Sequence, residues 1–200
     1  MQTLRIQAID LLDIIYNYLI TLDKKHLSFF LEAWPVKPFR TRIVTPKGIG
    51  VVSYLPELAV DANAKTRIIV KTFKNMAKHC RWGQTYKKED FGSAFLEKYG
   101  WTEVIGMRGL VKSRELACGF LMLGPDIEYP LHSHAAQEIY VPLTSQSLWK
   151  KGDELWKYRQ EGVPIYHKSW VDHGMKTGSA PLLALYLWRG GNLTQKSHIT

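Results

Sequence analysis

Four polar side chains in one short segment constrain the fold of this chain more than any other feature. His132, His134, Glu138 and Tyr140 all carry even numbers within residues 131–143. Side chains alternate between the two faces of a β-strand, so residues of equal parity share a face if this segment is one extended strand. Two imidazoles and a carboxylate that point into one space suit a first-row divalent metal. The segment therefore predicts a mononuclear metal site inside a β-barrel.

A third histidine, His173, follows about 35 residues after Glu138, far enough for intervening hairpins to return the chain to the site. The alternative is an exposed polar strand face, or two histidines that share a proton without a metal. An H-x-H pattern alone is common, but the added glutamate, the aromatic residue and the distant His-Gly-Met favour a metal. Zinc, iron, manganese, cobalt and nickel all accept histidine and carboxylate, so these ligands do not select one metal.

The composition is that of a folded protein with one domain. Of the 200 residues, 46% are hydrophobic and 12% aromatic, which is enough for a packed core. Cys80 and Cys118 form neither a C-x-x-C pair nor a disulfide framework, which indicates a reducing, cytoplasmic compartment. The apolar stretch at residues 9–22 contains Asp10 and Asp13 and lacks a small-residue cleavage site, so we expect neither a signal peptide nor a membrane span.

The net charge of +9 raises the question of a nucleic-acid partner. The lysines are spread along the chain, with pairs at 24–25, 87–88 and 150–151, and no helix-turn-helix, zinc-finger or arginine-rich pattern accompanies them. We therefore expect a solvated basic surface without a nucleic-acid or membrane partner. An anionic small molecule would also be attracted by this charge.

The first half of the chain is predicted to be mainly helical. Helices are expected at residues 4–30 with a break near Asp23, from an N-cap at Asp61 to about 80, and at 90–99, with extended segments at 40–58. The first helix has an apolar stripe typical of a buried face. It would pack on the barrel or on a second subunit of a homodimer.

Beyond Trp101 short β-rich runs alternate with turn residues. The runs cover residues 104–105, 116–123, 131–143 and 182–188, and Gly152-Asp153 has the character of a tight hairpin turn. Many short strands with regular turns indicate a sandwich or a barrel. The predicted fold is thus mainly β, with a helical N-terminal region at 1–102 and a barrel at 103–200.

The segment from Gly124 to Glu138, which reads G-P-D-I-E-Y-P-L-H-S-H-A-A-Q-E, resembles the first motif of the cupin barrels. Gly162-Val-Pro164, followed by His173, resembles a degenerate second motif in which the usual proline-glycine pair is missing. Cupins are small β-barrels that hold one metal through such residues. The resemblance implies a cupin-type barrel over the C-terminal half of the chain.

The chain resembles one cupin family more closely, the Q-type dimethylsulfoniopropionate (DMSP) lyases. The shared residues are Tyr129, His132, His134, Glu138, Tyr140 and His173, with the run P-L-L-A-L-Y-L-W-R-G-G at 181–191. The family cleaves DMSP to dimethyl sulfide and acrylate. The resemblance implies that His134, Glu138 and His173 bind the metal with Tyr140 close to it. His132 would belong to the same pocket, either as a further ligand or as a substrate-binding residue.

This reaction is a β-elimination and needs a base next to the metal. Tyr140 shares a strand face with the ligands, and a nearby cation can lower the pKa of a phenol from about 10. As a tyrosinate it would remove the proton α to the substrate carboxylate. Alternatively, Tyr140 would only pack in the core or donate a structural hydrogen bond to a ligand. Tyr129, just before the metal strand, is the second candidate for the base and would enter the pocket from its rim.

The other end of the substrate is a sulfonium cation, which aromatic faces bind. Trp188 is expected to line the pocket, whereas Arg189 has the opposite parity and should point outward. Cys118, Met122 and Met175 are expected to be core residues and not metal ligands. Two other functions remain open at this point: a different metal-dependent cupin enzyme, such as an oxygenase or an isomerase, and a non-catalytic cupin that binds a small ligand.

Overall fold

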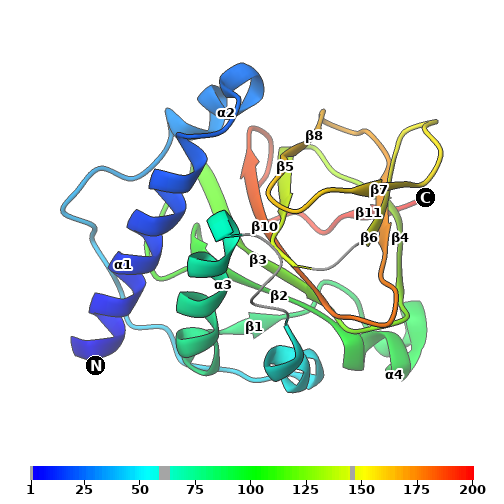
Figure 1. Ribbon diagram of the computed structural model, residues 1–200, viewed down its shortest axis with the longest axis horizontal. Helices are drawn as coiled ribbons and strands as arrows, with labels where there is room; N and C mark the ends of the chain where they lie inside the picture. Colours follow the sequence, from blue (N-terminus) through cyan, green and yellow to red (C-terminus); the bar gives the residue numbers. More distant parts are fainter. Residues whose placement is uncertain (1, 59–63, 145–146) are drawn as a thin grey trace.

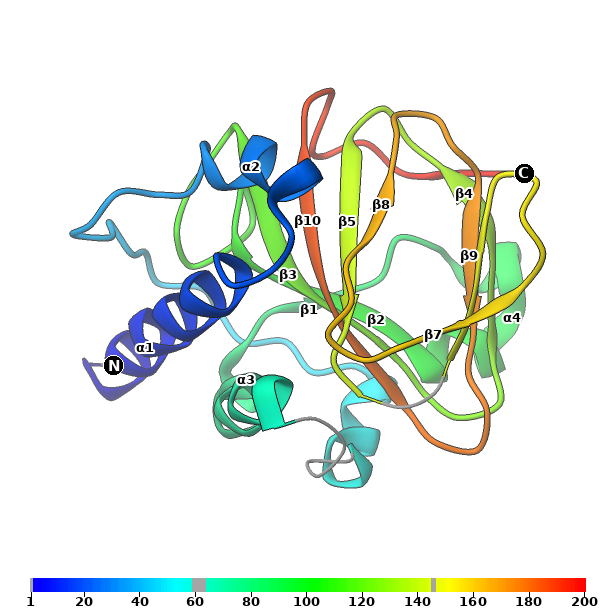
Figure 2. The same cartoon turned by 45° about the horizontal axis from the view of Figure 1, so that its top comes forward.

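The computed structural model describes residues 2–58, 64–144 and 147–200, with the side chains of 2–6 left aside. Two antiparallel sheets face each other and form a barrel, and helices cover one of them (Figures 1 and 2). The predicted mainly β barrel with a helical N-terminal extension is confirmed. The division into 1–102 and 103–200 stays a prediction, and its boundary falls inside one strand, Tyr99–Ile105.

The helices lie mainly in the first half of the chain. They are α1 (Gln2–Leu19), α2 (Lys24–Leu31), α3 (Ala64–Met76) and α4 (Lys88–Lys98), with two 3-10 helices, η1 (Gly50–Glu57) and η2 (Ala77–His79). The predicted break near Asp23 is confirmed, because the Asp23 side chain caps α2 by accepting a hydrogen bond from the Lys25 N–H at 3.0 Å. The predicted N-cap Asp61 lies outside the described residues.

The larger sheet has the strand order β1-β2-β3-β10-β5-β8. Its strands are β1 (Trp82–Gly83), β2 (Tyr99–Ile105), β3 (Leu116–Leu123), β10 (Leu182–Arg189), β5 (Gln137–Pro142) and β8 (Ile165–His167). All eight residues of β3 are buried, because α1 and α3 cover the outer face of this sheet and the barrel interior covers the inner face (Figure 2). Alternation along β5 then sends Ile139 and Val141 toward the helices, and Glu138 and Tyr140 into the barrel.

The smaller sheet has the order β11-β4-β9-β6-β7. Its strands are β11 (His198–Ile199), β4 (Glu128–Ser133), β9 (His173–Lys176), β6 (Ser147–Lys151) and β7 (Lys157–Arg159). β6 and β7 pair as an antiparallel hairpin around Gly152, whose φ of 52° is the left-handed conformation that glycine adopts readily. A hairpin was predicted here from Gly152-Asp153, but the connection between the last pair, Trp149 and Lys157, is longer than the tight turn that was expected.

Two sequence-based expectations were wrong. Residues 50–57 form the 3-10 helix η1 and not an extended segment, because Val51 is buried in the core and Gly50 packs directly on the backbone of Glu97 in α4. Residues 131–143 are not one strand: β4 ends at Ser133 and β5 begins at Gln137. Across the described residues, no helix is both long and apolar enough to cross a membrane.

Candidate metal centre

The chain crosses from one sheet to the other between His134 and Ala136. β4 belongs to the smaller sheet and β5 to the larger sheet, so the predicted ligands converge because the chain turns, and not because they share one strand face. The crossing is held by the Trp170 N–H, which donates to the His134 carbonyl at 2.9 Å, and by the Ser169 hydroxyl, which donates to the Ala135 carbonyl at 2.7 Å. The turn therefore brings the histidine pair and Glu138 to one end of the barrel.

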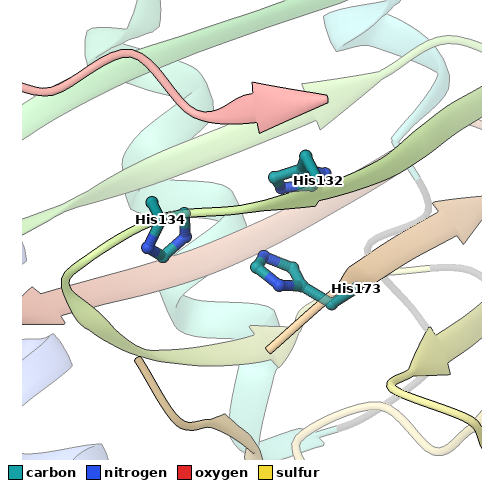
Figure 3. A group of neighbouring side chains, drawn as sticks. All are labelled: His132, His134 and His173. Atoms are coloured by element: carbon teal, nitrogen blue, oxygen red, sulfur yellow. The ribbon is translucent and has the colours of Figure 1, made fainter. Parts of the chain in front are cut away.

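Three buried imidazoles meet in the barrel interior (Figure 3). His132 comes from β4, His134 follows that strand, and His173 begins β9; one ring nitrogen of each lies within 4.8 Å of the others. The Nδ1 atom of each ring lies 2.8–2.9 Å from a backbone carbonyl oxygen, that of Pro130, Ala136 and Val171, respectively. A carbonyl only accepts, so Nδ1 carries a proton and Nε2 is the atom through which each ring would bind a metal.

Glu138 lies beside two of these histidines and is fully buried. Its Oε2 atom is 3.0 Å from Nε2 of His134 and 3.0 Å from Nε2 of His173. Its Oε1 atom accepts a 2.5 Å hydrogen bond from the indole N–H of Trp188. Burial alone would raise the pKa of Glu138, but the hydrogen bond with His134 and the proximity of His173 outweigh it, so that the pKa lies well below its usual value. The carboxyl group is therefore ionised.

The donor set fits a first-row divalent cation. Burial, together with the neighbouring His173, holds the pKa of His132 well below its usual value, so this imidazole is neutral as a ligand must be. Nε2 of His173 is buried and has no hydrogen-bond partner of good geometry among the described residues, which leaves its lone pair available. Neutral imidazoles with one carboxylate are the ligands typical of zinc, iron and related metals. Their role as ligands in this chain stays a prediction.

His167 was missed by the sequence analysis. It ends β8, where its Cα is paired with that of Glu138, and its ring stacks on that of His173 with the centroids 4.3 Å apart. Ligand atoms of Glu138, His167 and His173 lie within 4.8 Å of one another. The signal in the sequence is the short β-rich run Ile165-Tyr166-His167, which points to the site only once its pairing with β5 is known.

A cavity of about 300 Å³ opens beside the histidines. Four predicted site residues line it, namely Tyr129, His132, Tyr140 and Trp188. The remaining wall comes largely from β2, β10 and the C-terminal segment, with Trp101, Glu103, Arg108 and Lys196 among the residues that the sequence analysis did not single out. The predicted catalytic and substrate-binding residues thus lie around one cavity; their roles stay predictions.

The two tyrosines proposed as bases are both buried. The ring of Tyr129 stacks on His132 at 4.1 Å between centroids, and its hydroxyl lies 3.1 Å from that of Tyr86. The pKa of Tyr129 is well above its usual value because of burial and the neighbouring Tyr99. The pKa of Tyr140 is also raised well above its usual value, by burial and by the charge of Glu138. Both phenols are therefore neutral in the metal-free protein.

Trp188 and Arg189 lie on opposite sides of β10. The Trp188 ring lies over His134 with the centroids 4.0 Å apart and lines the cavity. The Arg189 guanidinium pairs with Glu32 at 3.1 Å and lies over the Phe29 ring, outside the barrel. The expectation that Arg189 points outward is confirmed. Cys118, Met122 and Met175 are buried core residues, as predicted.

A two-sheet barrel with histidines and a glutamate at one end is a cupin. The chain belongs to the dimethylsulfoniopropionate lyase family, a family of carbon–sulfur lyases whose sequence model matches residues 37–184. DMSP lyase DddQ of Ruegeria pomeroyi is 28% identical over 150 residues, which cover 74% of this chain and 73% of that protein. The putative DMSP lyase DddL of Cereibacter sphaeroides is 28% identical over 168 residues, 82% of this chain and 68% of that protein.

Solved structures agree with this family. The crystal structure of DddQ from Ruegeria pomeroyi superposes with a TM-score of 0.74 at 26% identity, over 85% of this chain and 87% of that chain. A chain from crystal structures of the DMSP lyases RdDddP and RnDddQII has a TM-score of 0.87 at 22% identity, over 98% and 99% of the two chains, and shows the shared fold. The predicted resemblance to cupin-type DMSP lyases is confirmed.

Proposed function

We propose that this chain is a metal-dependent DMSP lyase that produces dimethyl sulfide and acrylate by β-elimination. The observation that carries the proposal is that the candidate metal ligands are in contact with the cavity. His132 and Trp188 line the cavity, and the Trp188 indole N–H donates a hydrogen bond to Glu138. Membership of the DMSP lyase family supplies the substrate. A cavity of about 300 Å³ lies at the lower end of the usual range for small-molecule sites, as suits a small substrate.

His134, Glu138 and His173 would hold the cation, and His132, at the cavity wall, would either complete the ligand set or orient the substrate. The metal is one of zinc, iron, manganese, cobalt and nickel. A divalent cation in this place supplies positive charge next to the substrate carboxylate, which stabilises the negative charge that develops at the α carbon.

Tyr140 is proposed as the base. Its phenolate oxygen takes the α proton, the electrons of that C–H bond form the double bond of acrylate, and the bond from the β carbon to sulfur breaks with its electron pair leaving on dimethyl sulfide. Burial and Glu138 raise the pKa of the Tyr140 phenol, so its ionisation requires additional positive charge nearby. Tyr129, which also lines the cavity, is the second candidate for this role.

Trp188 is proposed to bind the sulfonium end of the substrate through its ring face. A cation–π contact contributes about 0.5–2 kcal/mol, so replacing Trp188 with leucine is expected to raise KM by roughly 2- to 30-fold relative to Trp188→Phe. Both variants lose the hydrogen bond to Glu138, so the comparison isolates the aromatic face. Steady-state kinetics of the two variants at equal metal content would measure this difference in KM. Equal KM values would show that the Trp188 ring does not bind the sulfonium.

Two further features of the protein belong to the proposal. Cys80 and Cys118 are free and buried, which supports the proposed cytoplasmic location.

The α1 helix buries its apolar side against the larger sheet and α3. Packing within one subunit therefore explains its apolar stripe, and a homodimer would use other surfaces.

An anaerobic assay separates the lyase from the oxygenase alternative. Elimination consumes no dioxygen, so purified protein loaded with metal should convert DMSP to equal amounts of acrylate and dimethyl sulfide in the absence of oxygen, followed by proton NMR. Turnover that requires dioxygen would overturn the lyase in favour of an oxygenase. Binding of DMSP without any turnover would favour a non-catalytic cupin.

A further inference from the structure

His167 is a buried histidine for which the catalytic proposal has no use. Its side chain is 1% exposed. Neither of its ring nitrogens has a hydrogen-bond partner within the described part of the chain. Buried polar groups without a partner are rare in folded proteins and indicate an ion or a water that satisfies them. The remaining question is which of these the surroundings of His167 would select.

The neighbours of His167 are residues proposed above as ligands for a metal. Glu138 lies opposite it on β5, and His173 stacks on its ring at an interplanar angle of 23°. The three residues place one ligand atom each within 4.8 Å of the others, and all three are buried. Both ring nitrogens of His167 are buried and without a hydrogen-bond partner among the described residues, so the ring offers a ligand atom to an ion. A carboxylate with two imidazoles is a donor set typical of a divalent transition metal.

None of the three residues of this triplet is part of the cavity wall that the described residues form. His132, in contrast, lines the cavity. The donor set of the proposed function, His134, Glu138 and His173 with His132, and the triplet of Glu138, His167 and His173 have Glu138 and His173 in common. Nδ1 of His173 lies 2.8 Å from the Val171 carbonyl, so Nε2 alone can bind a metal. One lone pair serves one cation, and the two sets are therefore alternative positions of a single ion.

We propose that Glu138, His167 and His173 form a second, deeper position for the divalent cation, which the ion occupies in exchange with the position at the cavity. His167 is thus a further metal-ligating residue of this centre. The inference rests on the metal centre of the proposed function but not on the reaction. Metal binding without substrate therefore tests it separately from lyase activity.

The test is a titration of the chelator-treated protein with Co²⁺, which reports stoichiometry, affinity and, through the visible spectrum, the ligand environment. His134→Ala should still bind one cobalt ion, with a spectrum that differs from that of the parent, because the deeper position does not include His134. His167→Ala should weaken binding about 10-fold or more and change the spectrum. The double variant should bind at least about 10-fold more weakly than either single variant. His79→Ala, on η2 outside the barrel, is the matched control and should leave binding unchanged.

Identical cobalt affinity and spectra for the parent and His167→Ala would overturn the inference while leaving the metal centre in place. Failure of the parent to bind cobalt would overturn both. His167→Gln retains a polar side chain of similar size in case the alanine variant does not fold. In the cobalt form, the hyperfine-shifted N–H signals of bound imidazoles count the histidine ligands, and one signal should disappear in the His167 variants but not in His79→Ala.

Discussion

Glu138→Ala is expected to abolish both metal binding and turnover. The carboxylate places a negative charge directly between His134 and His173, with 3.0 Å to the Nε2 atom of each. Removing it leaves neutral imidazoles, which bind a divalent cation without charge compensation. We expect the affinity for metal to fall by more than about 100-fold, which exceeds the typical loss when a residue that hydrogen-bonds to a metal ligand is replaced. Equilibrium dialysis followed by elemental analysis measures this loss.

The control for this variant is Glu128→Ala, which removes a surface carboxylate paired with Lys176 on the same barrel. It should keep one equivalent of metal and full turnover. His173→Ala should behave like Glu138→Ala, since His173 belongs to both donor sets. Full metal content in either Glu138→Ala or His173→Ala, in a protein with an unchanged circular dichroism spectrum, would show that the ligands have been assigned incorrectly.

Tyr140→Phe is expected to keep the metal and lose most of the turnover. The substitution removes one hydroxyl from a ring that is buried among Trp149, His167 and His173, so the packing is preserved. A positioned base contributes roughly 10²- to 10⁴-fold to the rate, and kcat should fall by that factor while metal content stays at one equivalent. Rate measurements on the metal-loaded parent and variant at saturating DMSP give the ratio of their kcat values.

Two further tyrosine variants complete this experiment. Tyr158→Phe changes an exposed ring and should have full activity. Tyr129→Phe changes a cavity residue that stacks on His132 and should reduce kcat by a smaller factor than Tyr140→Phe. If Tyr140→Phe turned over at the parent rate and Tyr129→Phe did not, the base would be Tyr129.

The candidate ligands could be predicted from the sequence because they are chemically distinctive and close together. The argument from one strand was nevertheless wrong, because the turn at 134–136 contains Ala135 and Ala136 and lacks the glycine, proline or asparagine that announces most turns. The even-numbered positions still meet inside the barrel. Glu138 and Tyr140 share the inner face of β5, whereas the two histidines reach the same space from the end of the other sheet.

The features that could not be predicted depend on contacts between distant segments. His167 becomes part of the centre only through the pairing of β8 with β5, and neither periodicity nor spacing reveals which strands are neighbours. Glu103 of β2 and Arg108, which follows this strand, join the cavity wall in the same way, because β2 pairs with β3 in the larger sheet. The η1 helix likewise owes its form to its packing on α4 and not to local propensity.

The central claim, a metal-dependent DMSP lyase, is tested most directly by headspace gas chromatography. The purified protein is stripped of metal, reloaded separately with manganese, iron, cobalt, nickel and zinc, and mixed with DMSP. We predict no dimethyl sulfide from the stripped protein, and release of dimethyl sulfide with an equal amount of acrylate from at least one reloaded form. A folded protein that demonstrably binds these metals but releases no dimethyl sulfide with any of them would contradict the proposed function.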